Sequence, residues 1–327
     1  MTRTPTLPAF AIFAAMIAAA GLPLYIHAPK FYVDEYGVSL AALGTVLFGL
    51  RLLDFVQDPV LGKLATVWRN KRGLSVCVAA LTMAAAMLGL FSVAPATTPL
   101  VWFAVMLTLV FSSFSYLTIC FYAEGVSSAQ RIEGQGHIKL ARWRETGALL
   151  GICAASVAPI AIGGYGGFAF AFAILTVVAL WAMRREWGGS EVESSTGFAG
   201  VLSDPVARRL LMVALFNAAP VAVSSTLFLF FVESKLDAPG WEGPFLLLFF
   251  LSAALAAPFW SRLAEAIGER KVLLVAMVLA IAAFGFAVTL GAGDTWAFGL
   301  ICLASGAALG ADMTLLPALF ARRMEKV

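Results

Sequence analysis

Charged side chains are scarce in this chain of 327 residues. Asp, Glu, Lys and Arg together make up 13% of it, about half of the roughly 25% found in soluble domains. Apolar residues make up 61%, the mean hydropathy is +0.92, and they form blocks long enough to cross a bilayer core of about 30 Å. The scarcity of charge excludes a soluble globular domain and indicates an all-α polytopic membrane protein embedded in a lipid bilayer. The net charge of only +3 gives no reason to expect a nucleic-acid partner.

Reactive side chains and catalytic motifs are equally sparse. The four cysteines, Cys77, Cys120, Cys153 and Cys302, all lie in apolar segments, which is typical of small buried hydrophobes rather than of a disulfide set or a metal site. The sequence contains no P-loop, no HExxH and no GxSxG motif, which excludes the ATP-driven pumps and hydrolases that depend on them. We therefore expect a protein that is not an enzyme and has no cofactor.

Ten membrane spans are predicted from the length of the apolar blocks. They lie at residues 7–28, 38–61, 74–94, 99–123, 145–163, 165–183, 208–232, 243–264, 272–290 and 295–320. Of the 22 Lys and Arg residues, 19 then fall on one side, Lys30 and Lys235 fall on the other, and Arg51 lies inside a span. The positive-inside rule places both termini in the cytoplasm, as an even number of spans requires.

The connection after the sixth span divides the chain. Its Gly, Ser and Glu content is typical of a solvated linker. We expect a six-helix bundle at residues 1–184, a cytoplasmic linker at 185–207 and an incomplete four-helix bundle at 208–327.

Two basic cytoplasmic loops indicate an internal repeat. GKLATVWRNKRG follows the second span and SRLAEAIGERK follows the eighth, and alignment of Gly62 with Ser261 also superimposes Pro59 on Pro258. Spans six apart are expected to correspond when a transporter is built from two related halves. Chance similarity of two basic loops is the alternative.

The loops and the repeat resemble the major facilitator superfamily, whose loop pattern is loosely Gly-x-x-x-Asp-Arg-x-Gly-Arg-Arg. The resemblance implies a helical bundle of twelve spans, of which the last two are missing here, and we expect a fragment, with a ten-span variant as the alternative. Gating loops are implied at Gly62, Arg69, Arg72, Glu265 and Arg270.

Three charged residues interrupt the second span, in the stretch RLLDFVQDPVLG. Arg51, Asp54 and Asp58 are separated by three and four residues and so share one helix face. Asp54 lies about 13 Å from Lys63 along the helix, close to mid-membrane, where ionisable groups normally face a bundle interior or a cavity. The two carboxylates repel each other as anions, which favours a site for Na⁺ or a proton, tuned by Arg51. A purely structural Arg51–Asp54 salt bridge is the alternative, and for Asp58 a further alternative is organisation of the following loop with Arg69 or Arg72. Pro59 lacks an N–H group, so a bend is expected at Phe55.

The pattern Arg-x-x-Asp-x-x-x-Asp-Pro-x-x-Gly resembles the second-span motif of the glycoside–pentoside–hexuronide:cation symporters. This resemblance implies that Asp54 and Asp58 carry the coupling cation, assisted by Arg51. The chain departs from the family in span one, which contains no carboxylate, and in span four, where Ser113 occupies the place of an acid or amide. Ser113 is accordingly a candidate cation ligand.

Further polar residues are candidates for the solute path. They are Tyr116, Asn217 and Asp312, together with Arg142 or Arg144, to which the resemblance implies the substrate-binding arginine at the start of span five. Arg142, Arg144 and Glu145 are also candidates for an intracellular gate with Asp58. For each of them the alternative is a packing or anchoring role, because polar side chains in membranes also bond neighbouring helices. Glu124, at the cytoplasmic end of span four, is expected to be solvated.

Together these features predict a secondary active transporter that couples Na⁺ or H⁺ to a small polar, sugar-like solute in a bacterial-type inner membrane. A carrier of a lipid or another amphipathic solute, and a non-transporting membrane interaction protein, are the alternatives.

Overall fold

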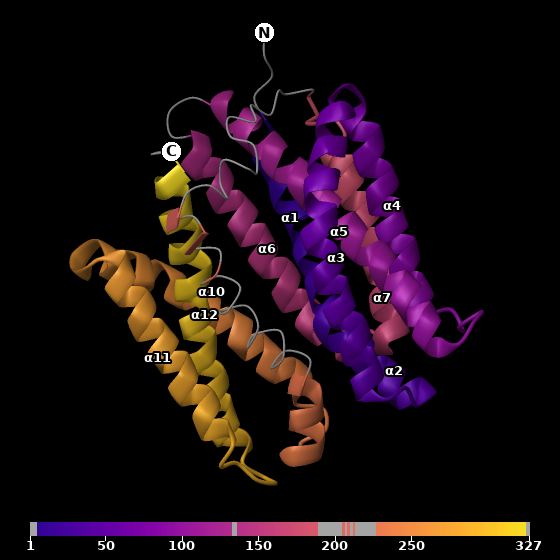
Figure 1. Cartoon of the computed structure of the whole chain (residues 1–327), viewed down its shortest axis with the longest axis vertical. Helices are drawn as coiled ribbons and strands as arrows, with labels where there is room; N and C mark the ends of the chain where they lie inside the picture. Colours follow the sequence, from indigo (N-terminus) through magenta and orange to yellow (C-terminus); the bar gives the residue numbers. More distant parts are fainter. Residues whose placement is uncertain are drawn as a thin grey trace. The chain divides into compact units, whose positions relative to one another are not determined.

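The computed structural model describes residues 5–132, 136–188 and 227–324, together with residues 205, 206, 208, 209 and 212. Every regular element within these ranges is helical, which confirms the all-α fold (Figure 1). The chain forms two compact units, Met1–Glu193 and Ser194–Val327. The division falls inside the segment 185–207 that was assigned to a linker, most of which lies outside the described residues.

The first unit contains most of the described helices. They are α1 (Leu7–Leu22), the π-helical turn η1 (Pro23–His27), α2 (Ala28–Tyr36), α3 (Leu40–Val67), the 3₁₀ turn η2 (Arg69–Lys71), α4 (Arg72–Phe91), α5 (Pro99–Gln130), α6 (Gly136–Ala161) and α7 (Gly164–Met183). Within this unit α1 packs chiefly on α6, α4 lies against α5 and α7, and α3 lies against α5.

The second unit contains a shorter set of described elements. They are the π-helical turn η3 (Phe231–Lys235), α10 (Glu242–Ile267), α11 (Glu269–Ala287) and α12 (Thr295–Met324). Helix α12 packs on both α10 and α11. The predicted span 208–232 lies largely outside the described residues.

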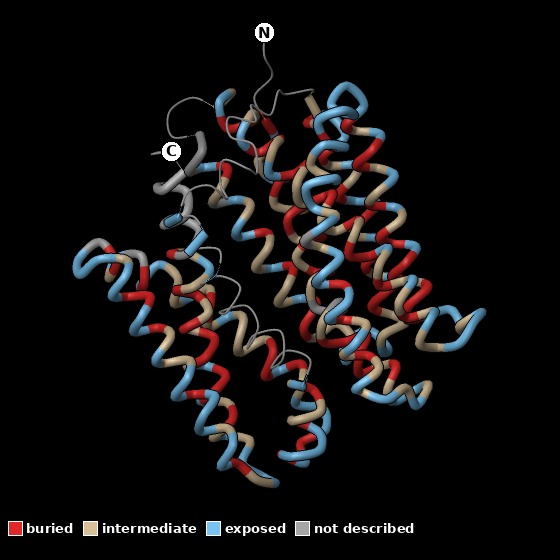
Figure 2. Tube along the Cα trace, viewed as in Figure 1, coloured by how far each residue is buried: buried red, intermediate tan, exposed pale blue. Residues whose placement is uncertain are grey.

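Among the described helices, seven are long and apolar enough to cross a membrane, and the bent helix α3 would be the eighth. These helices lie at the positions of eight of the ten predicted spans. The predicted span 145–163 is also helical, as part of α6, but its apolar part is short and follows a charged first half, so it is not among the eight. Outward-facing apolar residues such as Leu274, Val278 and Ile281 form a stripe along α11, as expected of a surface against lipid, and Figure 2 shows the exposed side of this helix.

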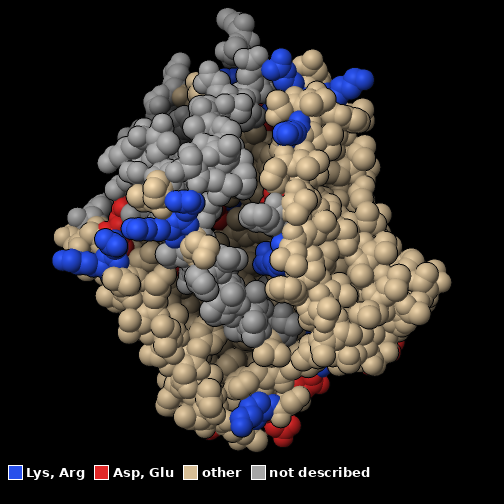
Figure 3. Space-filling model, in the orientation of Figure 1, with Lys and Arg blue, Asp and Glu red and all other residues tan. Residues whose placement is uncertain are grey.

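Charged side chains gather near the ends of the helices. In Figure 3 the face of unit 1 on the right of the view carries Lys and Arg at its upper edge and a broad uncharged surface below them. This distribution suits a bundle whose sides contact acyl chains and whose ends contact headgroups and water.

Helix α3 is longer than predicted, and it bends where a bend was predicted. Ser39 caps its N-terminus by accepting a hydrogen bond from the Ala42 N–H at 3.3 Å. The helix bends by 46° between Asp54 and Val56, one turn before Pro59, whose missing N–H leaves the Phe55 carbonyl without its helical donor. The helix was expected to end at residue 61 but continues to Val67, because KLATV contains good helix formers and no breaker. Gly62 therefore lies within a helix and not, as predicted, in a loop.

Glycines allow the closest helix contacts in both units. A side chain at Gly147 or Gly151 of α6 would collide with the backbone of Ala11 or Ala15 of α1. In the second unit, Gly306 and Gly310 of α12 lie equally close to the backbone of α10 at Phe249 and Ala253. Small residues at such spacing let membrane helices pack at short range.

The end of α7 leads into a segment that closes one end of unit 1. Glu186 is buried, and its carboxylate accepts a hydrogen bond from the Thr6 N–H at 3.3 Å, next to the first turn of α1. Trp187 packs edge-on against Phe13 of α1 with ring centroids 5.3 Å apart, and its side chain lies beside Gly73 of α4. This segment therefore ties α1 to α4 at the bundle end.

Candidate functional site

The charged residues of the second span lie on both sides of the bend of α3. Arg51 and Asp54 precede the bend and Asp58 follows it. The Arg51 Nη1 atom lies 3.9 Å from Asp54 Oδ2, and the two side chains are 48% and 20% exposed. Asp58 is exposed within the unit. The arrangement places two carboxylates on either side of a break in helical hydrogen bonding.

Helix α5 completes this group with hydroxyl oxygens. Gln57 donates from Nε2 to Asp54 Oδ1 at 2.8 Å, and the Ser112 hydroxyl donates to Gln57 Oε1 at 2.8 Å. The Ser115 hydroxyl donates to Asp58 Oδ1 at 2.5 Å. We call these five residues, Asp54, Gln57, Asp58, Ser112 and Ser115, the α3–α5 cluster. Carboxylate, amide and hydroxyl oxygens are the ligands that hard cations prefer.

Sequence reasoning found the two carboxylates of this cluster and missed its other members. Gln57 lies three residues after Asp54, a spacing that places it on the same helix face, so a signal for it was present. Ser113 was named as a ligand, whereas the hydroxyls that bond α3 belong to its neighbours Ser112 and Ser115. Ser113 is buried, and its role as a cation ligand stays a prediction.

Tyr116 extends toward a different helix. Its hydroxyl donates to the Ser75 hydroxyl of α4 at 2.7 Å, and Ser75 in turn donates to the Arg72 carbonyl at 2.9 Å. Tyr116 is only 5% exposed. The structure thus uses this hydroxyl to join α5 to α4, and contact of Tyr116 with a solute stays a prediction.

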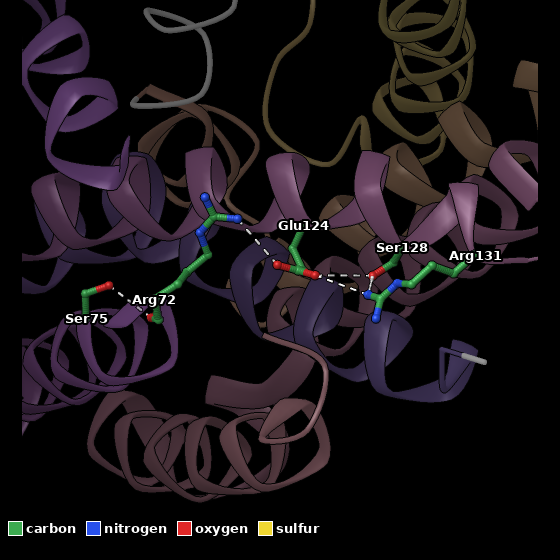
Figure 4. A network of polar contacts seen from close by, with 5 residues as sticks. All are labelled: Arg72, Ser75, Glu124, Ser128 and Arg131. Carbon is green, nitrogen blue, oxygen red and sulfur yellow. Dashed lines mark hydrogen bonds and ion pairs between the residues drawn. The ribbon is translucent and has the colours of Figure 1, made fainter. Parts of the chain in front are cut away.

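A buried charge network lies farther along α5, and it corrects two expectations. Figure 4 shows the Glu124 carboxylate between two guanidinium groups, with Arg72 3.4 Å away and Arg131 3.3 Å away. Ser128 donates to Glu124 at 3.4 Å and accepts from Arg131 at 2.6 Å. The Gly188 N–H also hydrogen bonds to this carboxylate.

Glu124 was expected to be solvated and Arg72 to lie in a gating loop. Instead both side chains are buried, 0% and 1% exposed. The reason is that α4 begins at Arg72 and packs along α5, which removes both groups from water at once. A charge is tolerated there because its partners are held close on more than one side.

The predicted residues of span five are described in part. Arg144 pairs with Glu145 at 2.8 Å, and its guanidinium lies over the Tyr122 ring of α5, 4.3 Å from the centroid. The Arg142 side chain lies outside the described part of the chain. Contact of these residues with Asp58 or with a solute stays a prediction.

The remaining predicted residues are spread over the chain. Arg69 lies in η2, Arg270 is exposed near the start of α11, and Asp312 is half-buried in α12. Asn217 and the Glu265 side chain lie outside the described residues. The roles of these residues in gating or in the solute path stay predictions.

The second unit uses the helices of the sequence repeat differently. Helix α10 contains Pro258, which aligns with Pro59 of α3, and packs on α12. Two of its polar contacts go to backbone carbonyls: Ser252 donates to Leu303 at 2.6 Å and the Trp260 ring N–H to Ala307 at 2.7 Å. Where α3 carries Arg51, Asp54 and Asp58, the same alignment gives α10 only apolar residues.

Comparison with known proteins supplies the family. A family model described as MFS/sugar transport protein matches residues 8–326, nearly the whole chain. No curated protein matches the chain at a significant level. A helical protein with at least seven membrane-capable helices among its described residues is what this family predicts. The chain therefore belongs to the MFS/sugar transport protein family.

Proposed function

We propose that the protein is a secondary active transporter that couples the movement of Na⁺ or H⁺ to that of a small polar, sugar-like solute. The observation that carries this proposal is the α3–α5 cluster, in which two carboxylates flank a helix bend, one hydrogen bonded to an amide and the other to a hydroxyl. Membership of a sugar transport family supports a small-molecule solute.

Asp54 and Asp58 would bind the coupling ion. Their negative charges repel each other while the site is empty, and a bound Na⁺ or proton removes that repulsion. The bend at Phe55 gives α3 a point at which the segments carrying the two carboxylates can shift relative to each other. Binding of the ion thereby favours one arrangement of α3 over the other, which is the requirement for coupling a cation to a conformational change.

The excess of Lys and Arg on one side of the predicted spans supports an orientation with both termini in the cytoplasm. The two units would be the two halves of the transporter, joined by the segment 185–207. Solute would be exposed to each side of the inner membrane in turn by alternating access.

The proposal is tested by thermal unfolding of the purified full chain in detergent. Melting is followed in NaCl and in choline chloride at equal ionic strength, at two pH values. A ligand at a hundredfold excess over its Kd stabilises the folded state by about 2.7 kcal/mol, so Na⁺ or acidification should raise the Tm by several degrees. Asp54→Asn should remove the rise.

Asp294→Asn is the matched control, because Asp294 accepts a hydrogen bond from the Gly291 N–H in the turn before α12, in the other unit. This variant should keep the cation response of the native protein. A native Tm that is indifferent to both Na⁺ and pH, or an Asp54→Asn variant that responds like the native chain, would contradict the proposal.

A further inference from the structure

Tyr25 lies where α1 gives way to a π-helical turn. This turn, Pro23–His27, separates α1 from α2, and single π turns recur at functional sites because they redirect side chains. The Tyr25 ring packs edge-on against Phe111 of α5, with centroids 5.4 Å apart. The Tyr25 ring thereby connects this turn to α5 and lies beside the first half of α3.

The face of this ring holds the Arg51 guanidinium. The Cζ atom of Arg51 lies 4.5 Å from the ring centroid, within the range of a cation–π interaction. Arg51 therefore has two partners, the Tyr25 ring of η1 and the Asp54 carboxylate of its own helix α3.

The distance between the Arg51 guanidinium and the Asp54 carboxylate is longer than that of a hydrogen-bonded ion pair. The nearest Arg51 nitrogen is 3.9 Å from Asp54 Oδ2, whereas a charge-assisted hydrogen bond between such groups is about 2.7–2.9 Å long. The other carboxylate oxygen, Oδ1, accepts from Gln57. Arg51 thus attracts Asp54 electrostatically at a distance that is too long for a hydrogen bond.

We propose that Tyr25 is a positioning residue of the cation site, which holds the Arg51 guanidinium on its ring and so keeps Asp54 Oδ2 accessible to the coupling ion. This inference rests on the proposed function, because it assigns Asp54 to cation binding. Without the ring, the long and half-exposed Arg51 side chain closes onto Asp54 and competes with the ion for the same oxygen. Tyr25 then sets the cation affinity without contacting the cation.

The test is a cation titration of the full chain in detergent, read from the Tm. Tyr25→Phe keeps the ring face and should bind Na⁺ as the native protein does. Tyr25→Leu removes the face and should weaken apparent Na⁺ affinity roughly three- to tenfold, as expected of a cation–π contact at a partly exposed site. Tyr25→Met, which is unbranched and adaptable, provides a second non-aromatic variant if the leucine variant folds poorly.

The Arg51→Gln background separates positioning from packing. There the competing guanidinium is absent, so adding Tyr25→Leu should leave the cation affinity of Arg51→Gln unchanged. An equal loss of affinity in both backgrounds, or native affinity in both non-aromatic variants, would overturn the role of Tyr25. If the native chain responds to pH and not to Na⁺, the same comparison is made on the pH midpoint of the Tm. A native chain that responds to neither would overturn the proposed function and this inference together, whereas a native response with indifferent Tyr25 variants overturns this inference alone.

Discussion

At the scale of single residues, Asp54 and Glu124 illustrate two ways of keeping a carboxylate within a membrane bundle. Glu124 is fully buried between two guanidinium groups at 3.3 and 3.4 Å. Asp54 has one arginine, at 3.9 Å, and an amide donor. Fixed cations surround Glu124 closely, which favours a structural role. The looser surroundings of Asp54 suit a site that exchanges a mobile cation.

Removal of the Glu124 charge should destabilise unit 1 strongly. Glu124→Gln leaves Arg72 and Arg131 in place without the carboxylate that both of them contact, and breaking a buried ion pair typically costs about 3–5 kcal/mol. We expect a clear fall in the Tm of the purified chain, or poor recovery of folded protein. Glu35→Gln, at an exposed position of α2, is the matched control and should change the Tm little.

Replacing both Arg72 and Glu124 shows whether a fall in the Tm of Glu124→Gln comes from an unpaired buried charge or from lost packing. The double variant Arg72→Met/Glu124→Leu removes both charges of the fully buried Arg72–Glu124 pair. It should therefore melt at a higher temperature than Glu124→Gln, which leaves the Arg72 charge buried without its partner carboxylate. If Glu124→Gln melts like the native chain, the network contributes no stability and our interpretation of it is wrong.

At the scale of helices, the contact of α1 with α6 depends on the absence of side chains. Gly147→Ala would direct a methyl group at the Ala11 carbonyl, and overpacking of this kind costs about 1–3 kcal/mol. We expect the Tm of the Gly147→Ala variant to fall. Gly44→Ala in α3 meets no atom within 4 Å and should hold or raise the Tm, because alanine is the better helix former. Equal Tm values for the two variants would show that the close approach of α1 and α6 is unimportant for stability.

At the scale of helices, the sequence predicts the features that depend on neighbouring residues and misses those that depend on how helices pack. The apolar blocks predict the helices at eight of the ten expected spans, and the lone Pro59 predicts the bend of α3, because both depend on local chemistry. The burial of Glu124 could not be predicted, since its partner Arg72 is 52 residues away and meets it only through the packing of α4 on α5. The choice of Ser112 and Ser115 over Ser113 likewise depends on the rotation of α5 about its axis, which four serines and threonines in close succession leave open.

At the scale of the whole molecule, the two units differ in the helix that carries the aligned proline. In the first unit this helix, α3, contains Arg51, Asp54 and Asp58, whereas α10 of the second unit has apolar residues at the aligned positions. Helices α3 and α10 each contain a proline at the aligned position. Only α3 places carboxylates beside it, facing hydroxyls of α5. An asymmetric pair of units of this kind is consistent with an ion site that belongs to one half of a transporter.

We propose that this molecule couples a cation to solute movement through Asp54. The most direct measurement is solid-supported-membrane electrometry on proteoliposomes that contain the full chain. Concentration jumps of a panel of mono- and disaccharides are applied in NaCl and in choline chloride at fixed pH, and the series is repeated at lower pH. Coupling through Asp54 predicts, for at least one sugar, a transient current that needs Na⁺ or acidic pH and is absent in Asp54→Asn. A sugar-induced current of the same size in native and Asp54→Asn protein would contradict it, as would a native protein that gives no current with any sugar under either condition.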